Sequence, residues 1–222
     1  MGRFNKLETL NYIKKTKVVP VFYDPSLEVT IEVASACYRG GIKILEFTNR
    51  GDLAWEVFKE LEKYCKENLP GMVLGAGSIS DATMADMYIS MGANFIVGPL
   101  TNENVATSCN RKKVPYMPGC LTPTEISKAE ELGCDVVKVF PADSLGGPSF
   151  VKSVLAPMPW AWIMPTGGVD MDPEGLKKWF DSGVFSVGMG SKLFTKEIMQ
   201  NKDWGLLEKQ CKKLSKILND IN

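Results

Sequence analysis

The chain alternates between two kinds of segment from end to end, and this alternation limits the folds open to it. Short runs rich in branched and aromatic residues have the composition of buried strands, and they lie at 18–22, 43–48, 72–75, 94–97, 114–117, 135–141, 162–165 and 185–188. An amphipathic stretch with helical spacing follows each run. Strands that alternate with helices form a parallel sheet, because each helix returns the chain to the start of the next strand.

Eight strand–helix units in succession favour a closed (β/α)8 TIM barrel, an α/β fold that commonly forms one domain of this size. We therefore expect a single domain over 1–222, with a lead-in helix at 5–15 and an extra C-terminal helix at 203–219. The other helices are expected at 26–39, 52–67, 80–91, 102–111, from 122 onward, and at 148–156, 172–181 and 190–199. An open, doubly wound sheet is the structural alternative, but no Gly-x-Gly-x-x-Gly follows the first strand to support it.

Composition narrows the range of functions. Lys and Arg together number 26, as do Asp and Glu, so there is no electrostatic reason to expect nucleic acid or an anionic membrane as a partner. No stretch resembles a signal peptide or a membrane span, and six scattered cysteines without a Cys-x-x-Cys pair fit reduced thiols in the cytoplasm. The chain has no histidine, which excludes Ser-His-Asp and Cys-His catalysis and most zinc sites.

One charged residue interrupts the apolar run at 135–141. Lys138 lies between Val137 and Val139 in a segment that reads as a strand buried on both faces. Burial without a partner favours the neutral amine, which is the nucleophile that enzymes use to form Schiff bases with carbonyl substrates. The alternative is structural: the segment is an edge strand, or the lysine stem packs while the amine reaches water.

A second charged residue falls on an inner face. Because strand residues alternate between faces, Glu46 and Arg50 point into the barrel from the second strand while Phe47 points toward the helices. Lys138 points inward from the sixth strand by the same rule. An ion pair between Glu46 and Lys138 that only stabilised the core would contribute little after desolvation, so we expect a functional role for both.

Glycine-rich turns close the last two strands. These are Thr166-Gly167-Gly168 and Gly188-Met189-Gly190-Ser191, at the strand ends where barrel enzymes often bind phosphate at a helix N-terminus. Backbone N–H groups and the Ser191 hydroxyl would hold the anion. Glycine is also common in such turns for conformational reasons alone, and that reading stays open.

Taken together, these motifs resemble a known family, the class I 2-keto-3-deoxy-6-phosphogluconate (KDPG) and 2-keto-4-hydroxyglutarate (KHG) aldolases. The resemblance runs from about 18 to 194, and its specific part is the pairing of Glu-x-Thr-x-Arg with Lys-x-Phe-Pro-Ala. The segments that carry it are Gly41–Arg50, Gly75–Ser78, Pro118–Gly119, Val137–Ala142, Pro165–Val169 and Gly188–Ser191.

The resemblance implies a role for each matching residue. Lys138 would attack the 2-keto carbon, Glu46 would transfer protons, and Arg50 would bind the substrate carboxylate. The hydroxyls of Ser78 and Thr166 would contact the pyruvyl part and the C4 oxygen. The distal phosphate would be bound by Gly167, Gly168, Gly190 and Ser191.

The implied enzyme is a lyase that releases pyruvate and an aldehyde, glyceraldehyde 3-phosphate or glyoxylate, without a metal or other cofactor, since the iminium is the electron sink. A keto acid is the implied partner, and the family suggests a homotrimer. Ser78, Gly98 and Cys120 depart from residues common in the family, and they bear on the aldehyde half of the substrate. Two alternatives remain: a phosphosugar isomerase or epimerase with Glu46 as base, which leaves Lys138 without a task, and a non-catalytic phosphate-ligand sensor.

Overall fold

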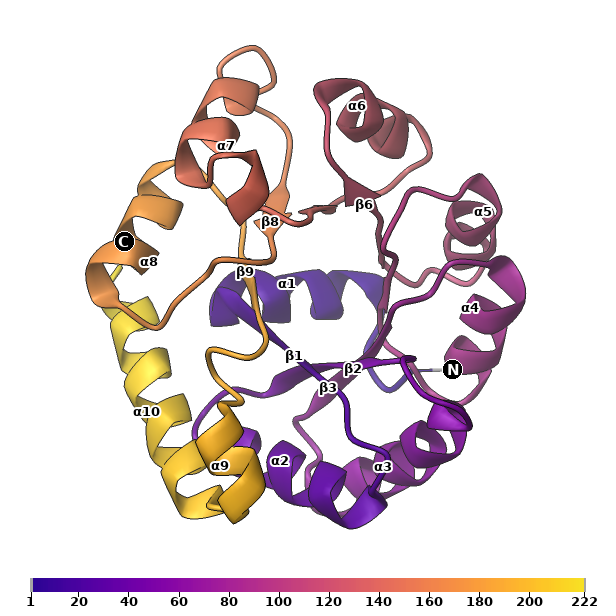
Figure 1. Ribbon diagram of the computed structural model, residues 1–222. Helices are drawn as coiled ribbons and strands as arrows, with labels where there is room; N and C mark the ends of the chain where they lie inside the picture. Colours follow the sequence, from indigo (N-terminus) through magenta and orange to yellow (C-terminus); the bar gives the residue numbers. More distant parts are fainter. Residues whose placement is uncertain (1, 222) are drawn as a thin grey trace.

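The structure, a computed structural model, describes residues 2–221 as a ring of helices around a parallel barrel (Figure 1). One set of strands pairs in the order β5-β4-β3-β2-β1-β9, and a second set pairs in the order β6-β7-β8. The strands are β1 (Val18–Phe22), β2 (Ile44–Thr48), β3 (Val73–Gly77), β4 (Ile96–Val97), β5 (Tyr116–Met117), β6 (Gly119–Cys120), β7 (Val137–Val139), β8 (Ile163–Pro165) and β9 (Val187–Met189). The TIM barrel expected from the sequence is confirmed.

Two joins close the two sets of strands into one barrel. At the first, the fifth expected strand is present as β5 and β6 on either side of Pro118, which has no N–H to donate. Its carbonyl still accepts a hydrogen bond of 2.8 Å from the Lys138 amide. At the second, the Phe185 amide donates to the Ile163 carbonyl at 2.9 Å, and Thr166 pairs with Gly188.

The helices lie close to their expected positions, and most begin where a polar side chain accepts a hydrogen bond from the first turn. These N-cap residues are Asn5, Ser26, Asp81, Asn102, Thr122, Asp172, Thr195 and Asp203. The helices are α1 (Lys6–Thr16), α2 (Leu27–Arg39), α3 (Ala54–Asn68), α4 (Ala82–Ser90), α5 (Glu103–Arg111), α6 (Pro123–Glu131), α7 (Pro148–Leu155), α8 (Pro173–Asp181), α9 (Lys196–Asn201) and α10 (Trp204–Asp220).

One helix boundary differs from the sequence prediction. The helix expected over 190–199 begins only at Lys196, after its N-cap Thr195. Before it, the amides of Leu193 and Phe194 both donate to the Gly190 carbonyl and form a turn. Gly190 and Ser191 therefore lie in a loop rather than at the start of a helix. A short 3-10 turn at Asp143–Leu145 was also not anticipated.

The faces of β2 agree with the expected alternation. All five of its residues are buried, as in a strand covered by helices on one side and by the barrel interior on the other. The ring of Phe47 packs against Phe58 of α3 and against Tyr23, with ring centroids 6.1 and 5.6 Å apart. Glu46 is adjacent to Phe47 on the strand, so its side chain points to the opposite face, into the barrel.

Both ends of the described chain lie at the base of the barrel, where the strands begin. α1 lies behind the strands in Figure 1. The Phe4 amide donates to the Asn94 side chain, just before β4, at 2.9 Å. At the other end, the amine of Lys17, which directly precedes β1, donates to the carbonyls of Leu218 and Ile221. In residues 2–221, no helix is both long and apolar enough to span a membrane.

Candidate active site

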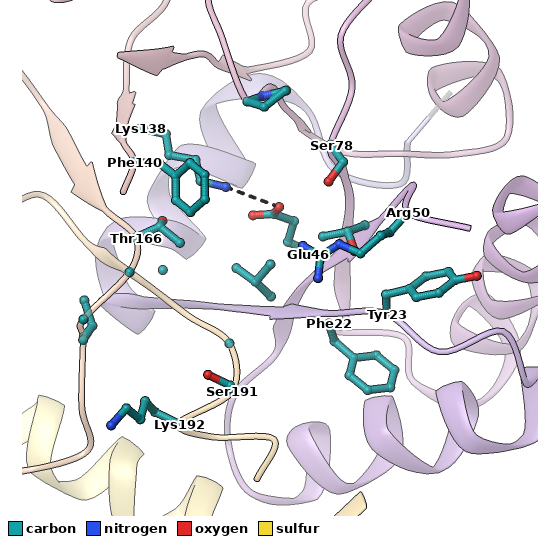
Figure 2. A pocket seen from close by; sticks show the side chains of 18 residues that line it. Phe22, Tyr23, Glu46, Arg50, Ser78, Lys138, Phe140, Thr166, Ser191 and Lys192 are labelled. Atoms are coloured by element: carbon teal, nitrogen blue, oxygen red, sulfur yellow. Dashed lines mark ion pairs between the residues drawn. The ribbon is translucent and has the colours of Figure 1, made fainter. Parts of the chain in front are cut away.

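A cavity of about 360 Å³ opens at the C-terminal ends of the strands (Figure 2). This is the face on which TIM barrels carry their active sites. The structure brings together in this cavity every residue that the sequence singled out for substrate chemistry: Glu46, Arg50, Ser78, Lys138, Thr166, Gly167, Gly168, Gly190 and Ser191.

Lys138 and Glu46 face each other across the barrel interior. They come from β7 and β2, and the lysine Nζ lies 3.7 Å from the glutamate Oε1, as the dashed line in Figure 2 marks. The two side chains are 9% and 1% exposed. The Phe140 ring lies beside the amine, with its centroid 5.4 Å from Nζ. The cavity therefore places one amine within reach of one carboxyl group, away from bulk water.

The environment of Glu46 favours the protonated acid more than water does. Burial raises the pKa of its carboxyl group, while the positive charges of Lys138 and Arg50 act in the opposite direction. Within residues 2–221, neither carboxylate oxygen has a hydrogen-bond partner. A carboxyl group without a hydrogen bond to the protein can give a proton to a ligand or accept one from it.

Two hydroxyl groups in the cavity are also without partners among the described residues. They are Oγ1 of Thr48, two positions beyond Glu46 on β2, and Oγ1 of Thr166 at the end of β8. A buried polar atom without a partner is costly, so native proteins seldom keep one without a functional reason. The two threonines can therefore hydrogen-bond to a ligand.

Two glycines leave space for the side chains of Glu46 and Thr166. A Cβ atom on Gly77 would lie 2.0 Å from Oε1 of Glu46, and a Cβ atom on Gly188 would lie 2.2 Å from Oγ1 of Thr166. No side chain fits at either position while the glutamate and the threonine keep their places. The glycines at these strand ends thus serve the neighbouring strand, a role that the sequence pattern did not reveal.

Arg50 and Ser78 lie just beyond the ends of β2 and β3. The Arg50 amide donates to the Thr48 carbonyl at 2.9 Å, which turns the chain at the end of the strand. Ser78 has a φ of 59°, in the left-handed region that non-glycine residues rarely adopt. Figure 2 shows both side chains on the side of the cavity that Glu46 occupies.

The glycine-rich turns form the other end of the cavity. Gly167 and Gly168 have φ values of 97° and 69°, which explains the glycines in this turn. Ser191 and Lys192 approach from the loop after β9. The helix N-terminus expected beside Ser191 is absent, because α9 begins at Lys196. On this side, an anion would meet the loop amides and the Ser191 hydroxyl instead.

The sequence did not single out several residues that line the cavity. Val21, Phe22 and Tyr23 follow from the position of β1, but no motif marks them. Lys192 does not lie within an apolar run, which is the feature that distinguished Lys138. The lining residues outside the quoted motifs are Val21, Phe22, Tyr23, Pro99 and Lys192, and the motifs contribute Thr48, Phe140, Val169 and Gly188 in addition to the predicted site residues.

Comparison with known proteins places the chain in a family. The model of the "KDPG and KHG aldolase" family matches residues 10–210. A 2-dehydro-3-deoxy-phosphogluconate aldolase from Treponema pallidum is 32% identical over 160 residues, which is 72% of this chain and 74% of the relative.

Two solved structures share the fold. The 2-keto-3-deoxy-6-phosphogluconate aldolase of Zymomonas mobilis, solved with 3-phosphoglycerate, is 26% identical with a TM-score of 0.81, covering 92% of this chain and 93% of that one. The KDPG aldolase from Legionella pneumophila, solved with pyruvate captured as a covalent carbinolamine, is 24% identical with a TM-score of 0.83, covering 92% and 97%. The chain therefore belongs to the KDPG and KHG aldolase family, and it is an aldolase, a carbon–carbon lyase.

Proposed function

We propose that this protein is a class I aldolase that cleaves a 2-keto-4-hydroxy acid reversibly to pyruvate and an aldehyde. The name of the family indicates two substrates. KDPG gives glyceraldehyde 3-phosphate as the aldehyde, and 4-hydroxy-2-oxoglutarate gives glyoxylate. The observation that carries the proposal is the buried pair of Lys138 and Glu46, with Nζ and Oε1 3.7 Å apart in the cavity. An isomerase or epimerase would need the carboxylate but would leave the lysine unused.

The proposed reaction begins at Lys138. Its neutral amine attacks the C2 carbonyl carbon, and Glu46 protonates the oxygen, so that the carbinolamine loses water and forms an iminium ion. Glu46, now a carboxylate, takes the proton of the C4 hydroxyl. The C3–C4 bond breaks, its electron pair moves to the iminium to form an enamine, and the aldehyde leaves. Protonation of the enamine at C3 and hydrolysis of the iminium release pyruvate and restore the amine.

The remaining predicted residues bind the substrate in this proposal. Arg50 pairs with the C1 carboxylate, since its planar guanidinium matches a carboxylate in two hydrogen bonds. The hydroxyls of Ser78 and Thr166 contact the pyruvyl part and the C4 oxygen, and the lack of a protein partner for Thr166 Oγ1 in the described chain supports its part.

The glycine-rich end of the cavity receives the distal group. Amides of Gly167, Gly168 and Gly190 and the hydroxyl of Ser191 provide donors for a phosphate or a second carboxylate. The relative from Zymomonas mobilis was solved with 3-phosphoglycerate, a ligand that carries both a carboxylate and a phosphate.

The test is borohydride reduction in the presence of pyruvate, followed by peptide mass mapping. We expect a reduced pyruvyl adduct on Lys138, as the covalent carbinolamine of the Legionella pneumophila enzyme suggests. The adduct should be absent from Lys138→Met and present in Lys152→Met, which removes an exposed lysine of α7. If the protein stays unlabelled under conditions that trap another class I aldolase, the Schiff-base proposal is wrong. An isomerase with Glu46 as its base would then be favoured.

The proposal extends to assembly and location. We propose a single folded domain that assembles as a homotrimer in the cytoplasm. Six buried free thiols support a reducing compartment. Leu100 and Leu121 support an interface, because these large apolar side chains follow β4 and β6 at the same end of the barrel and are exposed. Sedimentation equilibrium should give three times the 24.5 kDa chain mass, and a monomer would contradict the trimer.

A further inference from the structure

Lys192 is a cation at the distal end of the cavity to which the proposed reaction gives no role. It follows Ser191 in the loop after β9 and lines the cavity together with Gly167 and Gly168. Figure 2 shows it beside Ser191, at the opposite end from Lys138. The other cations that line the cavity, Arg50 and Lys138, serve the pyruvyl end.

The amine of Lys192 is held by a neighbouring carboxylate. Its Nζ lies 2.7 Å from Oδ1 of Asp170, and the two side chains are 54% and 52% exposed. An ion pair so open to water contributes little to stability, so the lysine can leave it easily for a stronger partner. A lysine also carries its charge on a flexible stem, so its amine can turn toward a ligand while the backbone stays in place.

Two carboxylates lie near this end of the cavity, and their charges oppose the binding of an anion there. Asp170 follows the glycine-rich turn, and Asp143 lies against it: a Cβ atom on Gly168 would lie 2.4 Å from the Cβ of Asp143. Two carboxylates beside a phosphate site would repel a phosphate unless a cation offsets them. Lys192 is the lining residue that can do so.

We propose that Lys192 determines specificity by leaving Asp170 to pair with the phosphate of the substrate. The enzyme then favours phosphorylated 2-keto-4-hydroxy acids over those with an uncharged distal end. Asp170 holds the amine near the cavity between turnovers and competes with the phosphate for it. The inference rests on the proposed function, since it assigns the distal group of that substrate.

Opposite effects of two variants test the proposal. The measured quantity is the ratio of kcat/KM for KDPG to that for unphosphorylated 2-keto-3-deoxygluconate. Lys192→Met should lower this ratio about tenfold, mainly through KM for the phosphorylated substrate, as expected for loss of one charge-assisted contact. Asp170→Asn should raise it about threefold, because it removes both a competitor for the amine and a repulsive charge.

A matched control is Lys196→Met, which removes an exposed lysine that does not line the cavity. The control should leave the ratio unchanged, and Lys192→Arg should retain most of it. If Lys192→Met lowers kcat/KM equally for both substrates, the lysine is structural and the proposal is wrong. A lower ratio in Asp170→Asn would overturn the competition between Asp170 and the phosphate.

Calorimetric titration with inorganic phosphate separates this inference from the proposed reaction. The phosphate Kd should rise at least fivefold in Lys192→Met and fall in Asp170→Asn, whether or not the protein cleaves either keto acid. Equal phosphate affinity in the wild type and Lys192→Met would overturn the inference even if pyruvate is trapped on Lys138. If the phosphate Kd shifts as expected but the protein traps no pyruvate, the result would support the anion site and contradict the proposed Schiff-base reaction.

Discussion

Glu46 is a carboxyl group that the fold buries completely, and this burial determines the pH range in which it can act as a base. Its pKa is raised by desolvation, so the carboxylate that deprotonates the C4 hydroxyl in the proposed reaction is lost as pH falls through that raised value. The acidic limb of kcat, which reports the enzyme–substrate complex in which Glu46 has become a carboxylate, should therefore lie above the ordinary glutamate pKa of about 4.3. A pH profile of KDPG cleavage measures it.

The control for this pH dependence is Glu46→Gln. We expect it to lower kcat by roughly 10²–10⁴, the usual contribution of a general acid or base, and to remove the acidic limb from the remaining activity. A limb that persists in the variant, or that lies at or below the ordinary value in the wild type, would assign the titration to another group.

Gly77→Ala tests the space that the glycine leaves for Glu46. The new Cβ would lie 2.0 Å from Oε1, so the carboxylate must move away from Lys138. We expect kcat to fall about a hundredfold, as for a misplaced catalytic group. Gly205→Ala is the control, because the nearest side-chain atom to its Cβ is 3.6 Å away and it lies in α10. Full activity in Gly77→Ala would show that the position of Glu46 is not critical.

The sequence was sufficient to predict which charged residues meet in the cavity but not the residues that accommodate them. Lys138 and Glu46 stood out because charged residues seldom lie within apolar strands. The need for Gly77 and Gly188 arises from contacts with Glu46 and Thr166 on neighbouring strands, and such contacts depend on the pairing register. Lys192 has no comparable signal, because a lysine in a loop is ordinary.

At the scale of the elements, the contact between α2 and α10 is close enough for a single substitution to probe it. Gly40 follows α2, and a Cβ atom there would lie 2.2 Å from the Cβ of Cys211 in α10. Gly40→Ala should lower the free energy of unfolding by about 1–3 kcal/mol, the usual cost of overpacking. Urea denaturation measures the loss, and Gly205→Ala again serves as the control. Unchanged stability would mean that α10 can shift freely.

The elements were largely predictable because each strand and helix has its own local pattern. The boundaries that were wrong depend on backbone hydrogen bonds that a hydrophobic pattern does not encode. The helix expected at 190–199 starts late because a turn on the Gly190 carbonyl precedes the N-cap Thr195. The fifth strand divides because Pro118 cannot donate, so its first piece pairs with β4 and its second with β7.

At the scale of the whole molecule, we predict that the barrel unfolds as one unit. The two sets of strands are joined through Pro118 and through the pairing of Thr166 with Gly188, so neither set is closed without the other. Circular dichroism and tryptophan fluorescence should report the same Tm, because the tryptophans lie at positions 55, 160, 162, 179 and 204, in both halves of the chain. Two separate transitions would contradict a single domain.

The positions of the two chain ends have a practical consequence. Gly2 and Ile221 lie at the base, where Phe4 and Lys17 fasten the terminal segments, and the cavity opens at the opposite end of the strands. A bead, a surface or a second enzyme attached through either end would therefore leave the mouth of the cavity free. An immobilised protein should keep the kcat/KM of the protein in solution, and a fused enzyme that makes the keto acid could deliver it to an unobstructed entrance.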